Sequence, residues 1–258
     1  MTGATHGTAQ GTTKGTTPHG VTGEEASSRW VRGMFGRIAG RYDLLNHLLS
    51  FNLDKRWRAH TVQRVADILV RPGARILDLC CGTADVLISL EAEHSSAPRL
   101  IMGSDFCHPM LIEARRKITN RQLRSPLFEA DALALPLASN SLDLVTVAFG
   151  FRNLANYGRG LEELARVLKP GGVLAILEFS QPANPLFAAL YGFFSARVLP
   201  LVGGLISGSR EAYSYLPESI RKFPGAEQLA EQMRNAGYSH VEVDRMTFGA
   251  VALHVGRK

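Results

Sequence analysis

The chain has 258 residues, of which 45% are hydrophobic and 20% charged, so it can bury the core of one domain of ordinary size. It contains no apolar run of the roughly 20 residues that cross a bilayer and no secretion signal, so we expect a cytoplasmic protein. Its three cysteines argue against a disulfide framework, and its net charge of +6 is spread along the chain, which is typical of a solvated surface.

The beginning of the chain differs in composition from the rest. Residues 1–27 are rich in Thr and Gly and poor in large apolar side chains, so we expect a disordered tail there. Residues 28–258 are expected to form one domain, with a helical N-terminal cap over 28–70 and a core over 71–258. Within that core, an apolar insertion over about 185–224 is interrupted by Gly and Pro. It fits either a core helix or an apolar lid at a membrane surface.

From residue 74 onward, short apolar runs alternate with stretches of helical periodicity. The runs, in chain order, are RILDL, RLIMGSD, PLFEAD, SLDLVTVAF and GGVLAILEFS. Such alternation predicts βαβ units and a largely parallel sheet. The last segment, HVEVDRMTFGAVALHVGR, has no room for a crossover helix and predicts an antiparallel hairpin. We therefore expect an α/β fold with a seven-stranded sheet and helices on both faces, which resembles the class I S-adenosylmethionine methyltransferases.

The turn after the first strand, DLCCGTA, carries the first candidate site. A zinc site needs spaced cysteine pairs, so Cys80 and Cys81 are better explained as buried thiols, and no metal is expected. A dinucleotide turn needs more glycines than Gly82 alone. Asp78 repels phosphate but suits a cationic ligand, and S-adenosylmethionine enzymes carry D/E-x-G-x-G-x-G at this turn. Ala84 takes an outer glycine position, where alanine is tolerated if φ stays negative.

Acidic residues also follow the next two strands. Asp105 ends the second strand, where its carboxylate can accept both ribose hydroxyls. Asp131 and Ala132 follow the third strand, where they can contact adenine through a carboxylate and a backbone N–H. Because ligands of open α/β sheets bind at the carboxyl ends of the strands, these residues together with Asp78 predict an S-adenosylmethionine site.

Longer motifs make the resemblance more specific. YDLLNHLLSFNLDKRW, RVLKPGGVLAILEFS, FGFRN and YSYLPESIRKFP resemble motifs of the UbiE/MenG-type menaquinone and ubiquinone biosynthesis C-methyltransferases. The resemblance covers the chain from about Arg29 to Lys258. It departs at Leu45 and Asp54, where the family has Met and His, and at Ala148, which is often Ser.

The resemblance implies an activity and its participants. The activity is methyl transfer from S-adenosylmethionine to a ring carbon of a reduced polyprenyl quinone, first of all demethylmenaquinol in menaquinone biosynthesis. It implies a polyprenyl quinol partner and transient contact with the inner face of the cell membrane. Thr83, Asp105, Asp131 and Ala132 match family positions that contact the cofactor.

The chemistry of a quinol suggests the catalytic residues. Its ring carbon becomes nucleophilic when a neighbouring hydroxyl loses its proton, so orientation and stabilisation of a phenolate suffice. Arg152, just beyond the fourth strand, is our candidate for that stabilisation, with a surface ion pair as the alternative. Tyr42 and His47 are candidates for proton removal, and His47 has the more suitable unperturbed pKa. Further candidates are Asp43, Asp54, Tyr213 and Tyr215, so the base is left unassigned.

Several alternatives stay open from the sequence alone. The acceptor can be another small aromatic, a benzoquinol or a sterol, and the chain can be a non-catalytic binding subunit that keeps the fold. An NAD-dependent oxidoreductase is disfavoured because GxGxxG is absent. No nucleic acid is expected, because the N/D-P-P-Y/F tetrapeptide of such methyltransferases is missing. The oligomeric state is open, a homo-oligomer included.

Overall fold

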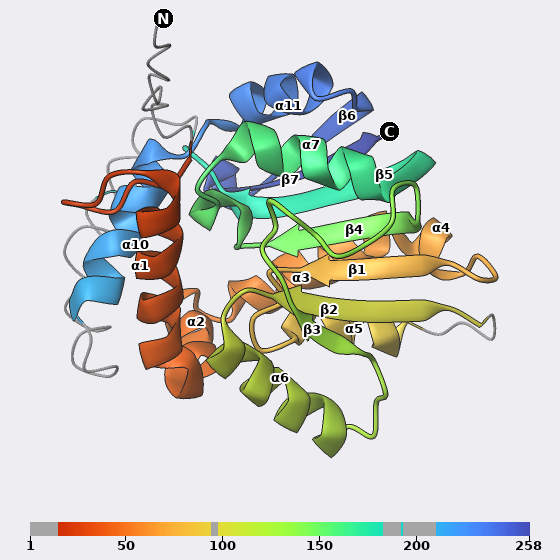
Figure 1. The fold of residues 1–258 in the computed structure, drawn as a ribbon, viewed down its shortest axis with the longest axis horizontal. Coiled ribbons are helices and arrows are strands. Elements are labelled where there is room, and N and C mark those ends of the chain that lie inside the picture. Colours follow the sequence, from red (N-terminus) through yellow and green to blue (C-terminus); the bar gives the residue numbers. More distant parts are fainter. Residues whose placement is uncertain (1–14, 94–97, 183–191, 193–209) are drawn as a thin grey trace, which may run out of the picture.

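A seven-stranded sheet forms the centre of the computed structural model, which describes residues 15–93, 98–182, 192 and 210–258 (Figure 1). The strands are β1 Arg75–Leu79, β2 Leu100–Asp105, β3 Leu127–Glu129, β4 Leu142–Ala148, β5 Leu168–Phe179, β6 Ser239–Met246 and β7 Val251–Arg257. Their order is β3-β2-β1-β4-β5-β7-β6, with the first five parallel and β7 antiparallel to both of its neighbours. The predicted parallel sheet closed by a hairpin is confirmed.

Helices cover both faces of this sheet and one of its ends. They are α1 Glu24–Ile38, α2 Tyr42–Leu49, α3 Leu53–Arg64, α4 Ala66–Leu69, α5 Asp85–Ala92, α6 His108–Asn120, α7 Tyr157–Val167, α10 Arg210–Lys222 and α11 Ala226–Asn235. Short 3-10 turns are η1 Ala39–Arg41, η2 Phe151–Asn153 and η4 Thr247–Gly249. Helices α3, α5 and α6 pack on one face and α7 and α11 on the other, while α1, α2 and α10 lie together at one end (Figure 1).

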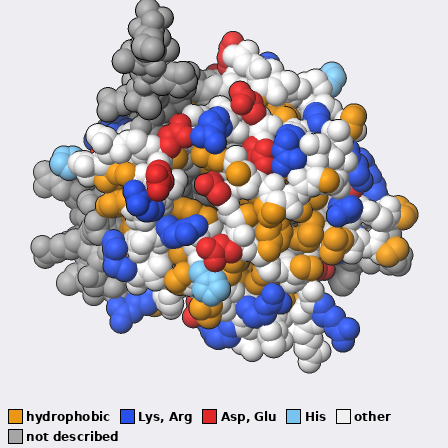
Figure 2. All heavy atoms as spheres, viewed as in Figure 1, with side chains coloured by type: hydrophobic (Ala, Val, Ile, Leu, Met, Phe, Trp, Pro, Cys, Tyr) orange, Lys and Arg blue, Asp and Glu red, His pale blue; other side chains and the backbone are white. Residues whose placement is uncertain are grey.

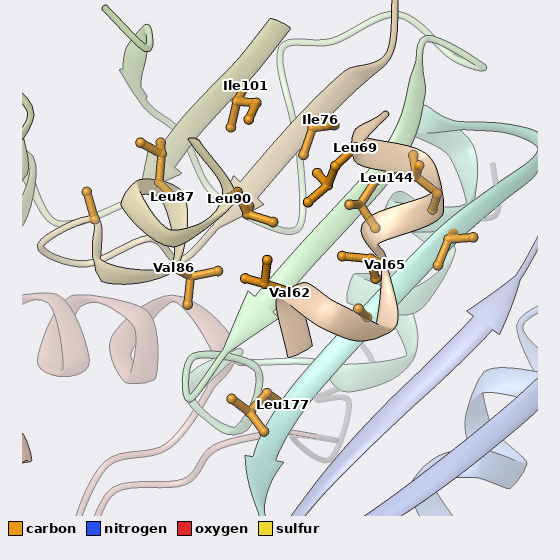
Figure 3. Packing of buried hydrophobic residues seen from close by; sticks show 14 of the residues in the cluster. Val62, Val65, Leu69, Ile76, Val86, Leu87, Leu90, Ile101, Leu144 and Leu177 are labelled. Atoms are coloured by element: carbon orange, nitrogen blue, oxygen red, sulfur yellow. The ribbon is translucent and has the colours of Figure 1, made fainter. Parts of the chain in front are cut away.

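The central strands are buried on both faces, which explains their continuous apolar runs. In β1, Ile76 packs against the α3–α5 side and the next residue, Leu77, against the α7–α11 side. Figure 3 shows the first of these cores, to which α3 contributes Val62, α5 contributes Leu87 and strand β4 contributes Leu144. Full burial of each such side chain contributes about 1.5–3 kcal/mol. The two cores hold the carboxyl ends of the strands in fixed positions.

The last part of the segment that was expected to be disordered has a defined structure. Residues 1–14 lie outside the described residues, but α1 begins at Glu24, and the preceding segment packs on the domain. The backbone N–H of Thr16 donates to the Leu154 carbonyl at 2.8 Å, and its hydroxyl lies 2.7 Å from the Tyr215 hydroxyl. Gly15 permits this approach, because a Cβ there would lie 2.3 Å from the carbonyl carbon of Ala155. Thr16 thus has hydrogen-bond partners in the domain that the polar composition of this segment did not predict.

In Figure 2, Lys and Arg are interspersed with Asp and Glu over the visible face. Most of the predicted insertion over about 185–224 lies outside the described residues, and α10 belongs to its last part. Among the residues that are described, no helix is both long and apolar enough to span a membrane.

Candidate active site

The turn between β1 and α5 is built from left-handed residues. Cys80, Gly82 and Ala84 have φ values of 53°, 54° and 73°. The negative φ on which we expected Ala84 to depend is therefore absent, and each non-glycine residue in this region costs about 1–2 kcal/mol. Ala84 is fully buried, and its N–H donates to the Cys81 carbonyl at 2.8 Å, so the packed turn holds it in place.

The same turn packs closely against the loop after β4. A Cβ added to Gly150 would lie 2.3 Å from the Cβ of Cys80, so the two loops touch at backbone distance. Burial raises the pKa of the Cys80 thiol well above its usual value, which keeps it neutral. Cys80 therefore acts here as a small packing residue between two loops.

Asp105, at the end of β2, supports this turn from the other side. Its Oδ2 accepts the backbone N–H of Gly82 at 2.9 Å, and its Oδ1 accepts that of Cys107 at 2.9 Å. Burial raises the pKa of this carboxyl to about 6, although the two N–H donors lower it. Each oxygen keeps acceptor capacity for one more donor.

A cavity of about 670 Å³, partly open to solvent, lies at these strand ends. Its lining is Ser28, Phe35, Tyr42, Leu79, Cys80, Gly82, Asp105, Phe106, Met110, Ala130, Asp131, Ala132, Ala148, Phe149, Gly150, Asn153, Leu154 and Ala155. The predicted residues Gly82, Asp105, Asp131 and Ala132 thus meet around one space, together with Tyr42. We call this space the larger half of the site.

A second cavity of about 350 Å³ adjoins it, because Tyr42, Cys80, Gly82, Ala148 and Phe149 line both. We call this second space the smaller half. Its remaining lining is Arg58, Asp78, Cys81, Thr83, Asp85 and Val86. The predicted residues Asp78 and Thr83 are therefore in the smaller half.

Asp78 has partners that the sequence did not indicate. Its Oδ1 accepts the Thr146 hydroxyl at 2.8 Å, and its Oδ2 accepts the backbone N–H of Leu87 at 3.1 Å. The latter is one of the N–H groups in the first turn of α5 that lack an intrahelical partner. Burial raises the pKa of Asp78 to about 7 despite these donors. Asp78 thus supports the N-terminus of α5 as well as lining the smaller half.

A chain of ion pairs runs through the smaller half. Arg58 joins Asp54 and Asp85 at 2.8 Å each, and Lys117 joins Asp85 and, at 2.7 Å, Asp43. The Asp43 carboxylate also accepts the Thr83 hydroxyl. Sequence reasoning missed Arg58, Asp85 and Lys117. Only the Asp54–Arg58 pair had a visible signal, its four-residue spacing on one helix.

Arg152 lies behind the wall of the larger half. Its guanidinium is 2.8 Å from Glu178 Oε1 and donates to the Phe149 carbonyl at 2.6 Å. Both side chains are buried, so the ion pair is internal, and the arginine does not line either half. Its neighbours Phe149 and Asn153 do line the larger half. Sequence reasoning missed Glu178, although it stands within the quoted RVLKPGGVLAILEFS.

The candidate bases occupy different places. Tyr42 lines both halves, and burial raises the pKa of its hydroxyl, so the phenol stays protonated at neutral pH. His47 lines neither half; its Nδ1 lies 2.8 Å from Asp54 Oδ2. Tyr215 reaches the larger half indirectly, by donating to Asn153 Oδ1 at 2.9 Å. The side chain of Tyr213 lies outside the described residues.

The chain is similar to known proteins over most of its length. Residues 22–258 match the ubiE/COQ5 methyltransferase family. The demethylmenaquinone methyltransferase of Thermus thermophilus is 49% identical over 223 residues, which are 86% of this chain and 99% of that protein. The demethylmenaquinone methyltransferase of Deinococcus radiodurans is 45% identical over 88% of this chain and 92% of its own.

Solved structures agree on the fold. A crystal structure of a SAM dependent methyltransferase from Aquifex aeolicus has a TM-score of 0.54 at 20% identity, over 76% of this chain and 88% of its own. A complex between the Haloferax volcanii Trm112 methyltransferase activator and the putative methyltransferase gives 0.60 at 21% identity, over 86% of this chain and 96% of the matched chain. At these identities the likeness shows the fold alone.

Proposed function

The chain belongs to the ubiE/COQ5 methyltransferase family, and from this premise we propose that it methylates a ring carbon of a reduced polyprenyl quinone, with demethylmenaquinol as the acceptor. It is an S-adenosylmethionine-dependent methyltransferase. The observation that carries the site is the meeting of Asp105, Asp131 and Ala132, from the ends of successive strands, around one cavity.

The residues present fit S-adenosylmethionine. Asp105 has an acceptor site left on each oxygen, which suits the two ribose hydroxyls. Asp131 and Ala132 would hold adenine, with Phe106 as an apolar wall. Gly82, with its neighbour Thr83, would hold the methionine end toward the smaller half.

The cofactor supplies an electrophilic methyl group on a sulfonium when bound. The positive charge of its sulfonium and ammonium groups suits the acidic lining that Asp78 and Asp105 provide. A phosphate-bearing cofactor would be repelled by the same two carboxylates, so the charge of the site favours this ligand over a dinucleotide.

The acceptor needs a phenolate next to the reacting carbon. We assign Tyr42 as a donor to that oxygen, because it lines the space shared by both halves and its phenol stays protonated. Arg152 adds positive charge from behind Phe149, and Glu178 balances that charge, so its effect on the acceptor is short-ranged. His47 would act on a proton only through the Asp54 network. The apolar walls orient the ring and exclude water.

The acceptor also decides where the enzyme works. A polyprenyl tail partitions into lipid, so we place the encounter at the inner face of the cell membrane, with the rest of the enzyme in the cytoplasm. Contact with the membrane is then peripheral and transient.

The test is a product assay. Purified protein is incubated with S-adenosylmethionine and chemically reduced demethylmenaquinone, and the quinone is followed by mass spectrometry. We expect a gain of one methyl on the naphthoquinol ring, and none when the reductant is omitted, because the oxidised ring is not nucleophilic. A benzoquinol is run in parallel to compare acceptors. Cofactor binding without product would contradict the assigned acceptor, and a failure to bind cofactor would favour a non-catalytic binding subunit.

A further inference from the structure

Three large apolar side chains are exposed close together where α2 runs into α3. Leu44, Leu48 and Phe51 have 61%, 46% and 72% of their surface exposed. Leu44 and Leu48 are four residues apart, so they share one face of α2. The turn that follows is left-handed at both Phe51 and Asn52, with φ values of 52° and 59°. A positive φ is a rare conformation for an aromatic residue, so this turn holds Phe51 outward at a cost in backbone strain.

The opposite side of α2 faces the site. Tyr42 lines both halves, and its ring lies 3.7 Å from the position that a Cβ on Gly82 would take. In a helix of 3.6 residues per turn, Leu44 is turned about 200° from Tyr42. One helix therefore carries a lining residue on one side and an exposed apolar face on the other.

The exposed charged residues of this stretch are basic. Between Tyr42 and Arg56, the exposed charged side chains are those of Lys55 and Arg56, at the start of α3. The acidic residues of the same stretch are turned inward, since Asp43 pairs with Lys117 and Asp54 is buried against Arg58. A partner that fits this surface therefore has an apolar region for the leucines and the phenylalanine, and negative charge beside that region for the basic side chains.

We propose that this surface, Leu44, Leu48 and Phe51 with Lys55 and Arg56, docks on an anionic lipid bilayer. The proposal rests on the proposed function, because a polyprenyl quinol must be taken from lipid. Apolar side chains enter the region between headgroups and acyl chains, while the flanking basic residues meet anionic headgroups. Three side chains are too few for the roughly 800 Å² that each partner buries in a stable protein interface. Docking brings the Tyr42 side of the site within one helix diameter of the lipid.

The experiment measures sedimentation of the full chain with vesicles of phosphatidylcholine, with and without phosphatidylglycerol. We expect binding to the anionic vesicles that weakens with salt. Leu44→Gln/Leu48→Gln keeps helix propensity and should lower the partition coefficient about tenfold or more. Lys55→Gln/Arg56→Gln should lower it about 25-fold, at about fivefold for each charge.

Matched controls separate this face from general surface effects. Ile112→Gln removes an apolar side chain that is 56% exposed on α6, and Arg121→Gln/Arg124→Gln removes two exposed charges elsewhere. Both should bind vesicles like the wild type. Equal binding by all variants, or no binding by the wild type, would overturn the proposal. So would a Leu44→Gln/Leu48→Gln variant that binds vesicles normally but changes oligomeric state in sedimentation velocity, which would assign the face to a second copy.

A second measurement distinguishes docking on the membrane from the methylation step. Methylation of a tail-free 1,4-naphthoquinol in solution should be unchanged in Leu44→Gln/Leu48→Gln, whereas methylation of demethylmenaquinol in vesicles should fall with the partition coefficient. Loss of both activities in this variant would contradict a docking role. If the wild type methylates neither acceptor, the proposed function fails while vesicle binding still tests the surface.

Discussion

The two halves of the site are lined by chemically different side chains. The larger half is lined mainly by backbone and apolar side chains at the strand ends, with Asp105 and Asp131 as its acidic groups. The smaller half contains Arg58 and Asp85, which form an ion pair between α3 and α5, and Asp78, which is held by hydrogen bonds. The shape of the larger half therefore depends on how closely loops approach, while the smaller half depends on the balance of buried charge.

The largest effect is expected behind the wall of the larger half. Arg152→Ala leaves Glu178 as an uncompensated buried charge, so we expect the free energy of unfolding to fall by about 3–5 kcal/mol. Urea denaturation measures this loss. Arg71→Ala, which breaks the exposed pair with Asp67, is the control and should cost less than about 1 kcal/mol. Equal losses in the two variants would show that the buried ion pair contributes no more to the free energy of unfolding than the exposed pair does.

The next effect concerns the acid of the larger half. Asp105→Ala removes the acceptors of two backbone N–H groups and the two acceptor sites that we propose for the ribose, so we expect the Kd for S-adenosylmethionine to rise about 100-fold. Calorimetric titration measures it. Asp131→Ala, whose side chain also accepts the Leu133 N–H, should raise the Kd about tenfold. An unchanged Kd in Asp105→Ala would show that the ribose is not bound by this carboxylate.

A smaller effect tests the dependence of the larger half on close approach. Gly150→Ala places a methyl group against the Cβ of Cys80 and should lower the free energy of unfolding by about 1–3 kcal/mol. Cys80→Gly removes the obstacle and also suits the left-handed φ at position 80, so the double variant should recover most of the loss. Thermal denaturation of the four proteins measures the coupling. Without recovery in the double variant, the collision is not with Cys80.

The smallest effect is a pH dependence of binding. The pKa of Asp105 is about 6 and that of Asp78 about 7, so both carboxyls are largely protonated at pH 5.5 and ionised at pH 7.5. A ligand with positive charge favours the ionised form, so its affinity should increase as the pH rises through this range, by about tenfold in total. Calorimetry at several pH values measures it. S-adenosylhomocysteine, which lacks the sulfonium charge, should show a weaker dependence, and an affinity that decreases with pH would contradict the assignment.

Asp105 of the larger half and Asp78 of the smaller half could be predicted from sequence because their places follow from the topology of the sheet. Once the runs that contain Asp78 and Asp105 are recognised as parallel strands, their carboxyl ends must meet at one edge of the sheet. The paired strands β1 and β2 do bring these two ends together. The hairpin at the end of the sheet followed from its short turn in the same way.

The rest depends on contacts between residues far apart in the chain. The sequence around Lys117 does not indicate that this residue pairs with Asp85 of another helix. In the same way, the sequence around Arg152 does not indicate that Glu178 neutralises it. The left-handed φ of Ala84 was equally hidden, because tertiary packing overrides its backbone preference. The sequence therefore predicted Arg152 at the edge of the crevice. In the structure it is buried with Glu178, behind Phe149 and Asn153, which line the larger half.

The most direct test of the site is a crystal structure of the protein with S-adenosylhomocysteine bound. We expect both ribose hydroxyls on the Asp105 carboxylate, adenine beside Asp131 and Ala132, and the amino acid end at Gly82 toward the smaller half. A ligand held elsewhere, or with its ribose away from Asp105, would contradict this account.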